Sequence, residues 1–397
     1  MSARHAAFGT MGVAVAMALS GIGGLALRTA PPPVPSMRAE ASLSQACVYL
    51  WSRQAADGGW HSQTHGLMRS GQALTPFILH ALLAAASEAC APPPAGVERA
   101  ATFLRRHIDA DGQIGAEDPD VLEYPNYSTA YALRCLVRLG AAQDAPLIKK
   151  MRARLVREQF TRTNGFTEES PAFGGWGFGG PHAPGRTGHM DLSHTRKVLQ
   201  ALREAGLEDD AVFERARLFL RLMQRHPDET RAHPAPFLPV SPPPRGVRFD
   251  GGFFFSPIVL DANKGAVFAD ERGAFHGSYA TATGDGALAL IATGLPRDDT
   301  RVRAARSWLE RHPALDHPEG IAADNPQDWS EAVDFYHLAV RTEAAAALGL
   351  DADRRPRLRK LLGPRQQPDG RFVNERNHLM KEDDPLLATA LAVVALT

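Results

Sequence analysis

The residues most suited to chemistry lie in one short segment, HMDLSH, at positions 189–194. Asp191 stands between His189 and His194, and a carboxylate that orients an imidazole can act as an acid–base pair. The same side chains have a spacing that could hold a metal ion. An aspartate that caps a helix, beside histidines at the surface, explains the segment equally well. We favour this structural interpretation and keep the acid–base one as its alternative.

The segments that must position these residues follow one repeated pattern from residue 42 onwards. Each repeat is a helix, a glycine-rich turn carrying an aromatic residue, and a second helix rich in alanine. The clearest turn is QAADGGW at 54–60, and weaker versions are expected at 111–115, 164–166, 250–253, 319–321 and 367–372. Six helical hairpins are therefore predicted.

The two helices of each hairpin differ in charge. Those that enter the turns have arginines between apolar positions, which predicts an outer, solvated layer; they are 44–53, 97–107, 148–159, 212–225, 301–311 and 354–362. Those that leave the turns carry little charge and many alanines, which predicts an inner layer; they are 75–86, 127–139, 191–205, 279–293, 335–348 and 385–396. The chain ends in an apolar helix without a polar cap, so we expect an all-α ring in which 385–396 packs beside 75–86.

Two long inserts interrupt this pattern, at 167–190 and 227–275. Loops of this length in a compact domain are usually functional or disordered, and the aromatic residues in both favour order. Filling gaps between hairpins is the alternative.

Composition excludes several classes of protein. The 397 residues hold 44 Lys and Arg against 44 Asp and Glu, so no net charge attracts nucleic acid. A mean hydropathy of −0.23 excludes a polytopic membrane protein. Cys47, Cys90 and Cys135 lack metal or redox spacing and are expected to be small buried side chains, with at most one bridge between Cys47 and Cys90.

The first residues have the features of a targeting segment. Residues 6–27 carry no charge, and a proline-rich run follows at 31–35. We interpret 1–30 as a signal peptide or a membrane anchor, 31–41 as a spacer, and 42–397 as a single domain. The expected location is periplasmic or extracellular, and residues 6–27 tether the protein to the membrane if they form the anchor.

Several motifs, in this order, resemble the α/α toroids of the terpenoid cyclase and protein prenyltransferase superfamily. The turn at 54–60 is similar to the repeated glutamine–tryptophan motif of squalene-hopene cyclases. The motifs FGGWGFG (173–179), DLSHT (191–195), GSYAT (277–281) and QPDG (367–370) are most similar to secreted bacterial squalene-cyclase-like repeat proteins. The resemblance covers 42–397 and implies an α/α toroid in which each glutamine amide ties its turn to the next helix.

The resemblance also implies a strong acid that protonates an alkene, carried by an Asp-x-Asp-Asp-Thr tract. The matching tract here is DLSHT, which keeps Asp191 but places Ser193 where the donor should be. A serine hydroxyl cannot protonate an alkene, so proton-initiated cyclisation is not expected.

Zinc chemistry is the second activity that the resemblance implies. His337 resembles the zinc-binding histidine of protein prenyltransferases, and HGSY at 276–279 stands where that family has its aspartate and cysteine ligands. With His276 and Ser278 at those positions, too few good donors remain for zinc. We predict no metal and no cofactor, and we expect His337 at the mouth of the toroid.

The leading hypothesis is an exported toroid that binds an apolar or amphipathic ligand of isoprenoid type. One alternative is a noncanonical terpenoid-processing enzyme, a cyclase-like isomerase or lyase, with Asp191, His194 and His337 as acid–base groups. The other is a protein-interaction scaffold of the cell envelope. The residues expected around the ligand are Tyr127, Asp191, His194, Tyr279, Tyr336 and His337, since they start the inner helices, whose positive dipole ends would favour a polar or anionic head group.

Overall fold

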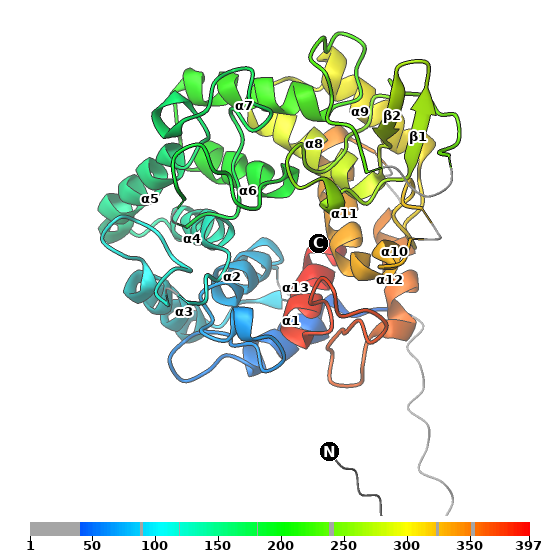
Figure 1. Ribbon diagram of the computed structural model, residues 1–397. Coiled ribbons are helices and arrows are strands. Elements are labelled where there is room, and N and C mark those ends of the chain that lie inside the picture. The colour runs from blue at the N-terminus through cyan, green and yellow to red at the C-terminus, as the bar shows by residue number, and fades with distance from the viewer. Residues whose placement is uncertain are drawn as a thin grey trace, which may run out of the picture. The chain divides into compact units, whose positions relative to one another are not determined.

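A computed structural model describes residues 40–397 except 88–89, 119, 181, 238–241, 323–324 and 351–353. Within them, six helices form an inner ring (Figure 1): α2 (Leu74–Ala84), α4 (Pro125–Leu139), α6 (Leu192–Glu204), α8 (Ala280–Ala292), α11 (Asp334–Leu348) and α13 (Pro385–Leu396). Each packs against the next, and α13 packs against α2. The predicted α/α toroid and its closure are confirmed.

The helices that enter the turns form the outer layer. They are α1 (Leu43–Ser52), α3 (Pro94–His107), α5 (Ala145–Arg157), α7 (Asp210–Met223), α9 (Thr300–Arg311) and α12 (Arg354–Leu362). Each packs with its apolar face on one or two inner helices. The short helix α10 (Trp329–Ala332) precedes α11, and single 3-10 turns lie at Gly66–Met68, Ala142–Asp144, Arg162–Asn164, Leu260–Ala262 and Gly363–Arg365.

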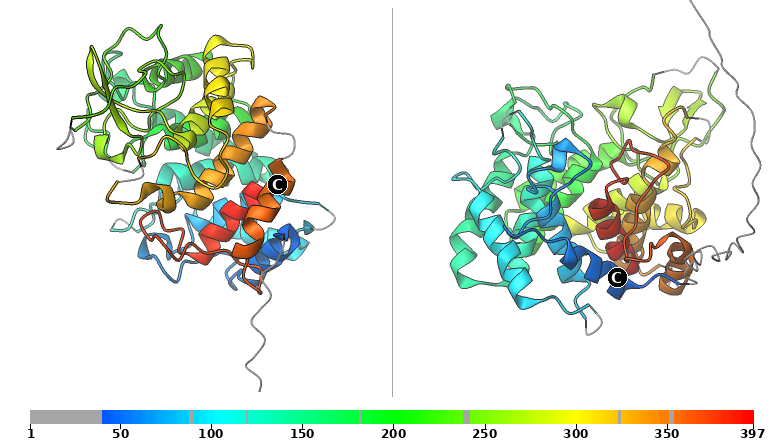
Figure 2. Two further views of the ribbon diagram at one scale, coloured as in Figure 1. Left: turned by 90° about the vertical axis from the view of Figure 1, so that its right-hand side faces the viewer. Right: turned by 90° about the horizontal axis from the view of Figure 1, so that it is seen from below.

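One small β-hairpin accompanies the helices in the described part of the chain. Strands β1 (Val267–Asp270) and β2 (Gly273–His276) pair antiparallel, with Val267 opposite His276. The hairpin belongs to the second insert and lies at one side of the ring (Figure 2, left view). It adds to the loops beside the ring and leaves the two helical layers unchanged.

Glutamine amides tie the repeats together, as the resemblance implied. Nε2 of Gln54 donates to the carbonyl of Gly58 at 3.0 Å and to that of Gly96, in the next outer helix, at 2.8 Å. Gly58 has φ +94°, and a Cβ there would lie 2.3 Å from the carbonyl oxygen of Arg99, so only glycine fits. The same pair of bonds recurs at Gln159, Gln224 and Gln366.

The last of these glutamines closes the ring. Nε2 of Gln366 donates to the carbonyl of Ser42 at 2.9 Å, and the Ser42 amide donates to its Oε1 at 2.7 Å. These bonds join residues 324 positions apart in the sequence. The final repeat is therefore fastened to the start of the first outer helix.

The third hairpin uses a different turn from the one predicted. Nε2 of Gln159 donates to the carbonyl of Gly174, not to a carbonyl of 164–166, and the Trp176 amide donates to the Thr195 hydroxyl at 3.0 Å. Trp60 makes the same bond to Thr75. The turn of the third repeat therefore lies within the first insert, and an additional loop separates it from Gln159.

Two further expectations concern cysteines and the membrane. All three cysteines are free and buried, so the structure contains no bridge between Cys47 and Cys90. In the part of the chain that the structure describes, no helix is both long and apolar enough to cross a membrane. Residues 6–27 lie outside that part.

Candidate functional site

A cavity of about 510 Å³ lies at the centre of the ring. Every inner helix contributes a residue from its first turn: Leu74, Tyr127, Ser193, Thr281, Tyr336 and Leu387. The amino-terminal ends of all six helices therefore gather at one cavity. Their partial positive charges favour electron-rich groups there.

The lining is mainly apolar and aromatic. Its aromatic side chains are Phe77, Tyr124, Tyr127, Tyr131, Phe178, Phe255, Tyr279, Trp329 and Tyr336. Deeper positions on the same helices supply Leu391, Val340 and Val394, together with the polar residues His80, Lys197 and Glu343. This arrangement, a large apolar surface with a few placed polar groups, is typical of small-molecule sites, and its volume is within their usual range.

Asp191 is the centre of a hydrogen-bond network at the amino-terminal end of α6. Its Oδ1 accepts from the Ser193 hydroxyl at 2.7 Å and from the His194 amide at 3.0 Å, which is the N-cap bond. Its Oδ2 lies 2.9 Å from Nδ1 of His194 and 3.0 Å from Nε2 of His189. Capping and orientation of an imidazole thus occur together, although the sequence analysis treated them as alternatives.

The network keeps Asp191 ionised. Burial by itself would raise the pKa of this carboxyl, but the charges and hydrogen bonds of His194 and His189 hold it well below its usual range. A group that is deprotonated at neutral pH has no proton to give to an alkene. Asp191 can instead orient His194, whose Nε2 is buried without a partner among the described residues.

Two tyrosines extend the polar groups along the cavity wall. Tyr127 lies near Ser193 and Tyr336, both of which interact electrostatically with its hydroxyl. The Tyr336 hydroxyl donates to Asp285 at 3.1 Å, and Asp285 accepts from Nη1 of Arg196 at 2.7 Å. Burial raises the pKa of both phenols well above the usual value, so they stay neutral. The hydrogen-bonded part of this wall therefore runs from Tyr336 through Asp285 to Arg196.

Five ionisable residues of the cavity, Lys197, Lys264, Glu343, Lys381 and Glu382, were missed by the sequence analysis. Burial lowers the pKa of Lys264 to about 8 and, with Arg196 beside it, that of Lys197 to about 7. Burial also raises the pKa of Glu382 to about 8, while the Phe335 and Tyr336 amides donate to it at 2.8 Å. Lys264 and Glu382 lie in loops, where no repeat or helix face indicates that a charge is buried.

The structure brings five of the six expected ligand residues to the cavity. Tyr127, Asp191, His194, Tyr279 and Tyr336 line it. His337 does not: its Nε2 lies 3.4 Å from the carbonyl of Ala314, and burial lowers its pKa to about 3. Adjacent helix residues point about 100° apart, so His337 faces away when Tyr336 faces inward.

The residues considered for zinc lie in separate surroundings. His276 stacks on Phe254, and its carbonyl accepts from Arg225, whereas the Ser278 hydroxyl donates to Asp250 at 2.8 Å. His337 lies beside Ala314. Among the described residues, no group of three or more His, Cys, Asp or Glu side chains is placed to hold a metal ion.

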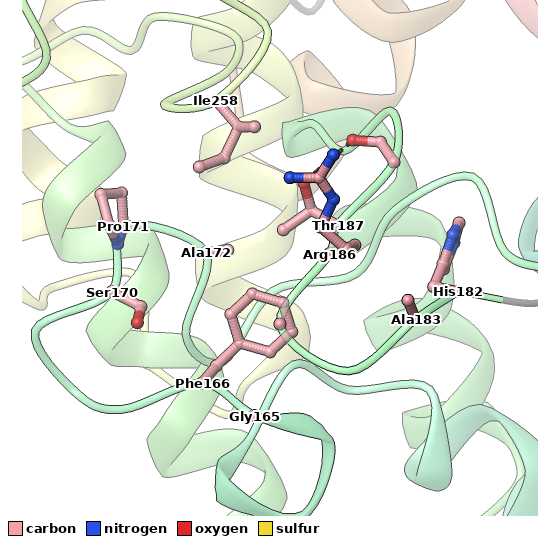
Figure 3. Close-up of a pocket in the computed structure, with 12 residues that line it drawn as sticks. Gly165, Phe166, Ser170, Pro171, Ala172, His182, Ala183, Arg186, Thr187 and Ile258 are labelled. Atoms are coloured by element: carbon pink, nitrogen blue, oxygen red, sulfur yellow. Dashed lines mark hydrogen bonds between the residues drawn. The ribbon is translucent and has the colours of Figure 1, made fainter.

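A second hollow, of about 720 Å³, is formed mainly by the first insert (Figure 3). Phe166 forms part of its wall, and its charged or ionisable lining groups, Arg186 and His182, are exposed. It contains no buried charged side chain that could orient a ligand. The central cavity is therefore the candidate site.

Comparison with known proteins gives fold-level likenesses. No family model and no curated protein matches the chain. Among solved structures, the type II terpene cyclase MstE from Scytonema, in its apo form, aligns with a TM-score of 0.48 and 16% identity, over 89% of this chain and 95% of that one. A variant of it in complex with geranylgeranyl dihydroxybenzoate gives 0.48 and 14% over the same shares, and a protein from Actinoplanes gives 0.48 and 16% over 89% and 97%. The toroid itself is established by the helix contacts within this chain.

Proposed function

We propose that the protein binds an elongated apolar ligand of isoprenoid type in its central cavity, with the polar end of the ligand at the amino-terminal ends of the inner helices. The observation that carries this proposal is the cavity of about 510 Å³ with its aromatic walls. A scaffold protein would need no such space, since side chains would fill the centre of the ring.

The acid–base properties of the site favour binding over cyclisation. Asp191 is held as a carboxylate, and Glu382, with a pKa of about 8, is far too weak an acid to protonate an alkene. The cavity therefore offers space for an apolar ligand but no acid strong enough to start a carbocation reaction. We infer a role in holding or carrying the lipid.

Lipid retention and a cavity-filling variant test this function. The full-length protein, extracted into organic solvent, should release about one prenyl lipid per chain, as measured by mass spectrometry. Ala339 lines the cavity on α11, so Ala339→Trp places an indole in the ligand's space and should weaken binding by at least ~10-fold. Ala346, exposed on the same helix, provides the matched control Ala346→Trp.

Two outcomes would contradict the proposal. Ala339→Trp that still retains lipid would place the ligand elsewhere, and a wild-type protein that binds no prenyl lipid would favour the scaffold. Conversion of squalene to a cyclic product, lost in Asp191→Asn, would show that the site does supply the acid.

Acid–base catalysis by His194 is the second candidate. Its Nδ1 is oriented by Asp191 at 2.9 Å, and its Nε2 has no hydrogen-bond partner in the described part of the chain. The centroid of its ring lies 4.5 Å from that of Tyr127. Turnover of a bound lipid that is lost in His194→Gln, with binding retained, would favour this candidate.

We also propose that the protein is exported, with residues 6–27 as signal or anchor. A fusion of residues 1–38 to a reporter that is active only outside the cytoplasm should be active, and removal of 6–27 should abolish the signal. A full-length chain that fractionates entirely with the cytoplasm would contradict this proposal.

A further inference from the structure

We propose that the ligand of the central cavity carries a single carboxylate, which binds the ammonium group of Lys264. This inference rests on the proposed function and adds the chemical class of the ligand's polar end. It starts from a buried ammonium group that has no carboxylate oxygen within 4.0 Å among the residues that the structure describes.

Lys264 is held in place by aromatic rings instead of by an acid. Its Nζ lies 4.1 Å from the centroid of Phe255 and 4.5 Å from that of Trp329, and it donates to the carbonyl of Ala262 at 3.1 Å. The residue is 6% exposed and lines the cavity. Within the described residues, no carboxylate oxygen lies within 4.0 Å of this nitrogen. An ammonium has three donors, so the bond to Ala262 leaves others for a ligand.

Two other buried charges of the cavity have charged partners. Lys197 lies 3.5 Å from Glu343, and the Asp191 carboxylate is bound by His189 and His194. Lys381 is half-buried and lies 5.8 Å from the centroid of the Tyr124 ring. Lys264 is therefore the buried cation of this cavity that gains most from an anionic ligand, because a desolvated charge without a counterion is costly.

The balance of charge indicates one negative charge on the ligand. Three lysines line the cavity, with the carboxyl groups of Asp191, Glu343 and Glu382. Burial raises the pKa of Glu382 to about 8, so at pH 7 mainly the other two are ionised. Because Lys197, with a pKa of about 7, is only partly protonated at pH 7, the lining has an excess of less than one positive charge, to which the helix amino-terminal ends add. A monocarboxylate supplies enough negative charge to neutralise this excess. A diphosphate carries more negative charge than the lining can balance and would be repelled by the Asp191 carboxylate.

The test compares three ligands that share one prenyl chain: geranylgeraniol, geranylgeranoic acid and geranylgeranyl diphosphate. Binding to the full-length protein is followed by tryptophan fluorescence, since Trp329 lies against Lys264. A charge-assisted hydrogen bond predicts that the acid binds about 10- to 100-fold more tightly than the alcohol. Lys264→Met should reduce the affinity for the acid to that for the alcohol and leave the affinity for the alcohol nearly unchanged.

Two further variants separate charge from packing. Lys264→Arg keeps the charge and should retain most of the preference for the acid. Lys360→Met removes an exposed ammonium from α12, outside the cavity, and should retain all of it. Equal affinity of wild-type protein for acid and alcohol would overturn the carboxylate while leaving prenyl binding intact. Tightest binding of the diphosphate would overturn the single charge, and no binding of any of the three would reject the proposed function itself.

Discussion

A chain truncated after Asp384 is expected to lose its folded structure. The truncation removes α13, whose residues Leu386, Leu391, Val393 and Leu396 are each less than a tenth exposed. It exposes the faces of α2, α11 and α1 against which α13 packs. Burial of one large aliphatic side chain stabilises by about 1.5 to 3 kcal/mol, and a whole domain is stable by only about 5 to 15 kcal/mol. The loss of four such side chains is therefore comparable to the total.

Circular dichroism during heating, together with solubility on expression, provides the measurement. The truncated chain should show no cooperative transition or should be insoluble. Leu396→Ala gives a graded form of the same test, with an expected loss of about 2 to 5 kcal/mol in the free energy of unfolding. Thr397→Ala, at the chain end, is the control and should change little. A truncated chain that melts like the full-length one would show that the ring does not depend on closure.

Much of the fold could be predicted from sequence because its signals are local. Runs of alanine identify helices that pack on both sides, and the turn at 54–60 carries its glutamine, glycine and tryptophan close together. The third turn was misplaced because Gln159 and Gly174 are fifteen residues apart and another glycine, Gly165, lies between them. The hydroxyls of Thr75 and Thr195, which accept hydrogen bonds from the amides of Trp60 and Trp176, were also missed, because a single threonine produces no periodic pattern.

The part of the site that could be predicted consists of the residues at the starts of the inner helices. Tyr127, Tyr279 and Tyr336 line the cavity because residues at these helix starts point toward the ring centre. His337 was misplaced because one step along a helix turns a side chain by about 100°. Lys264 and Glu382 could not be predicted, since their burial depends on how the loops pack over the ring, and no pattern in a loop sequence encodes that.

Arg196→Met is expected to destabilise the protein more than most single substitutions. The Arg196 side chain is fully buried on α6, between Asp285 on α8 and Glu343 on α11, and it donates to both carboxylates. Its removal leaves two carboxylates without their main counterion in the interior. Breaking a buried ion pair in this way costs about 3 to 5 kcal/mol, which urea unfolding followed by fluorescence can measure.

The control and the pH dependence separate lost charge from lost packing. Arg306→Met removes a surface partner of Glu310 and should cost less than about 1 kcal/mol. Adding Asp285→Asn and Glu343→Gln to Arg196→Met should restore much of the stability.

In the wild type, burial would raise the pKa of Glu343, but Arg196 and Lys197 hold it below its usual range. The stability that Glu343 contributes is therefore present above its unfolded pKa and is lost as the pH falls. In Arg196→Met, burial dominates, the pKa rises, and stability increases toward acid pH. The difference between the two proteins should therefore shrink between pH 8 and pH 5, and a constant difference would mean that Arg196 acts through packing alone.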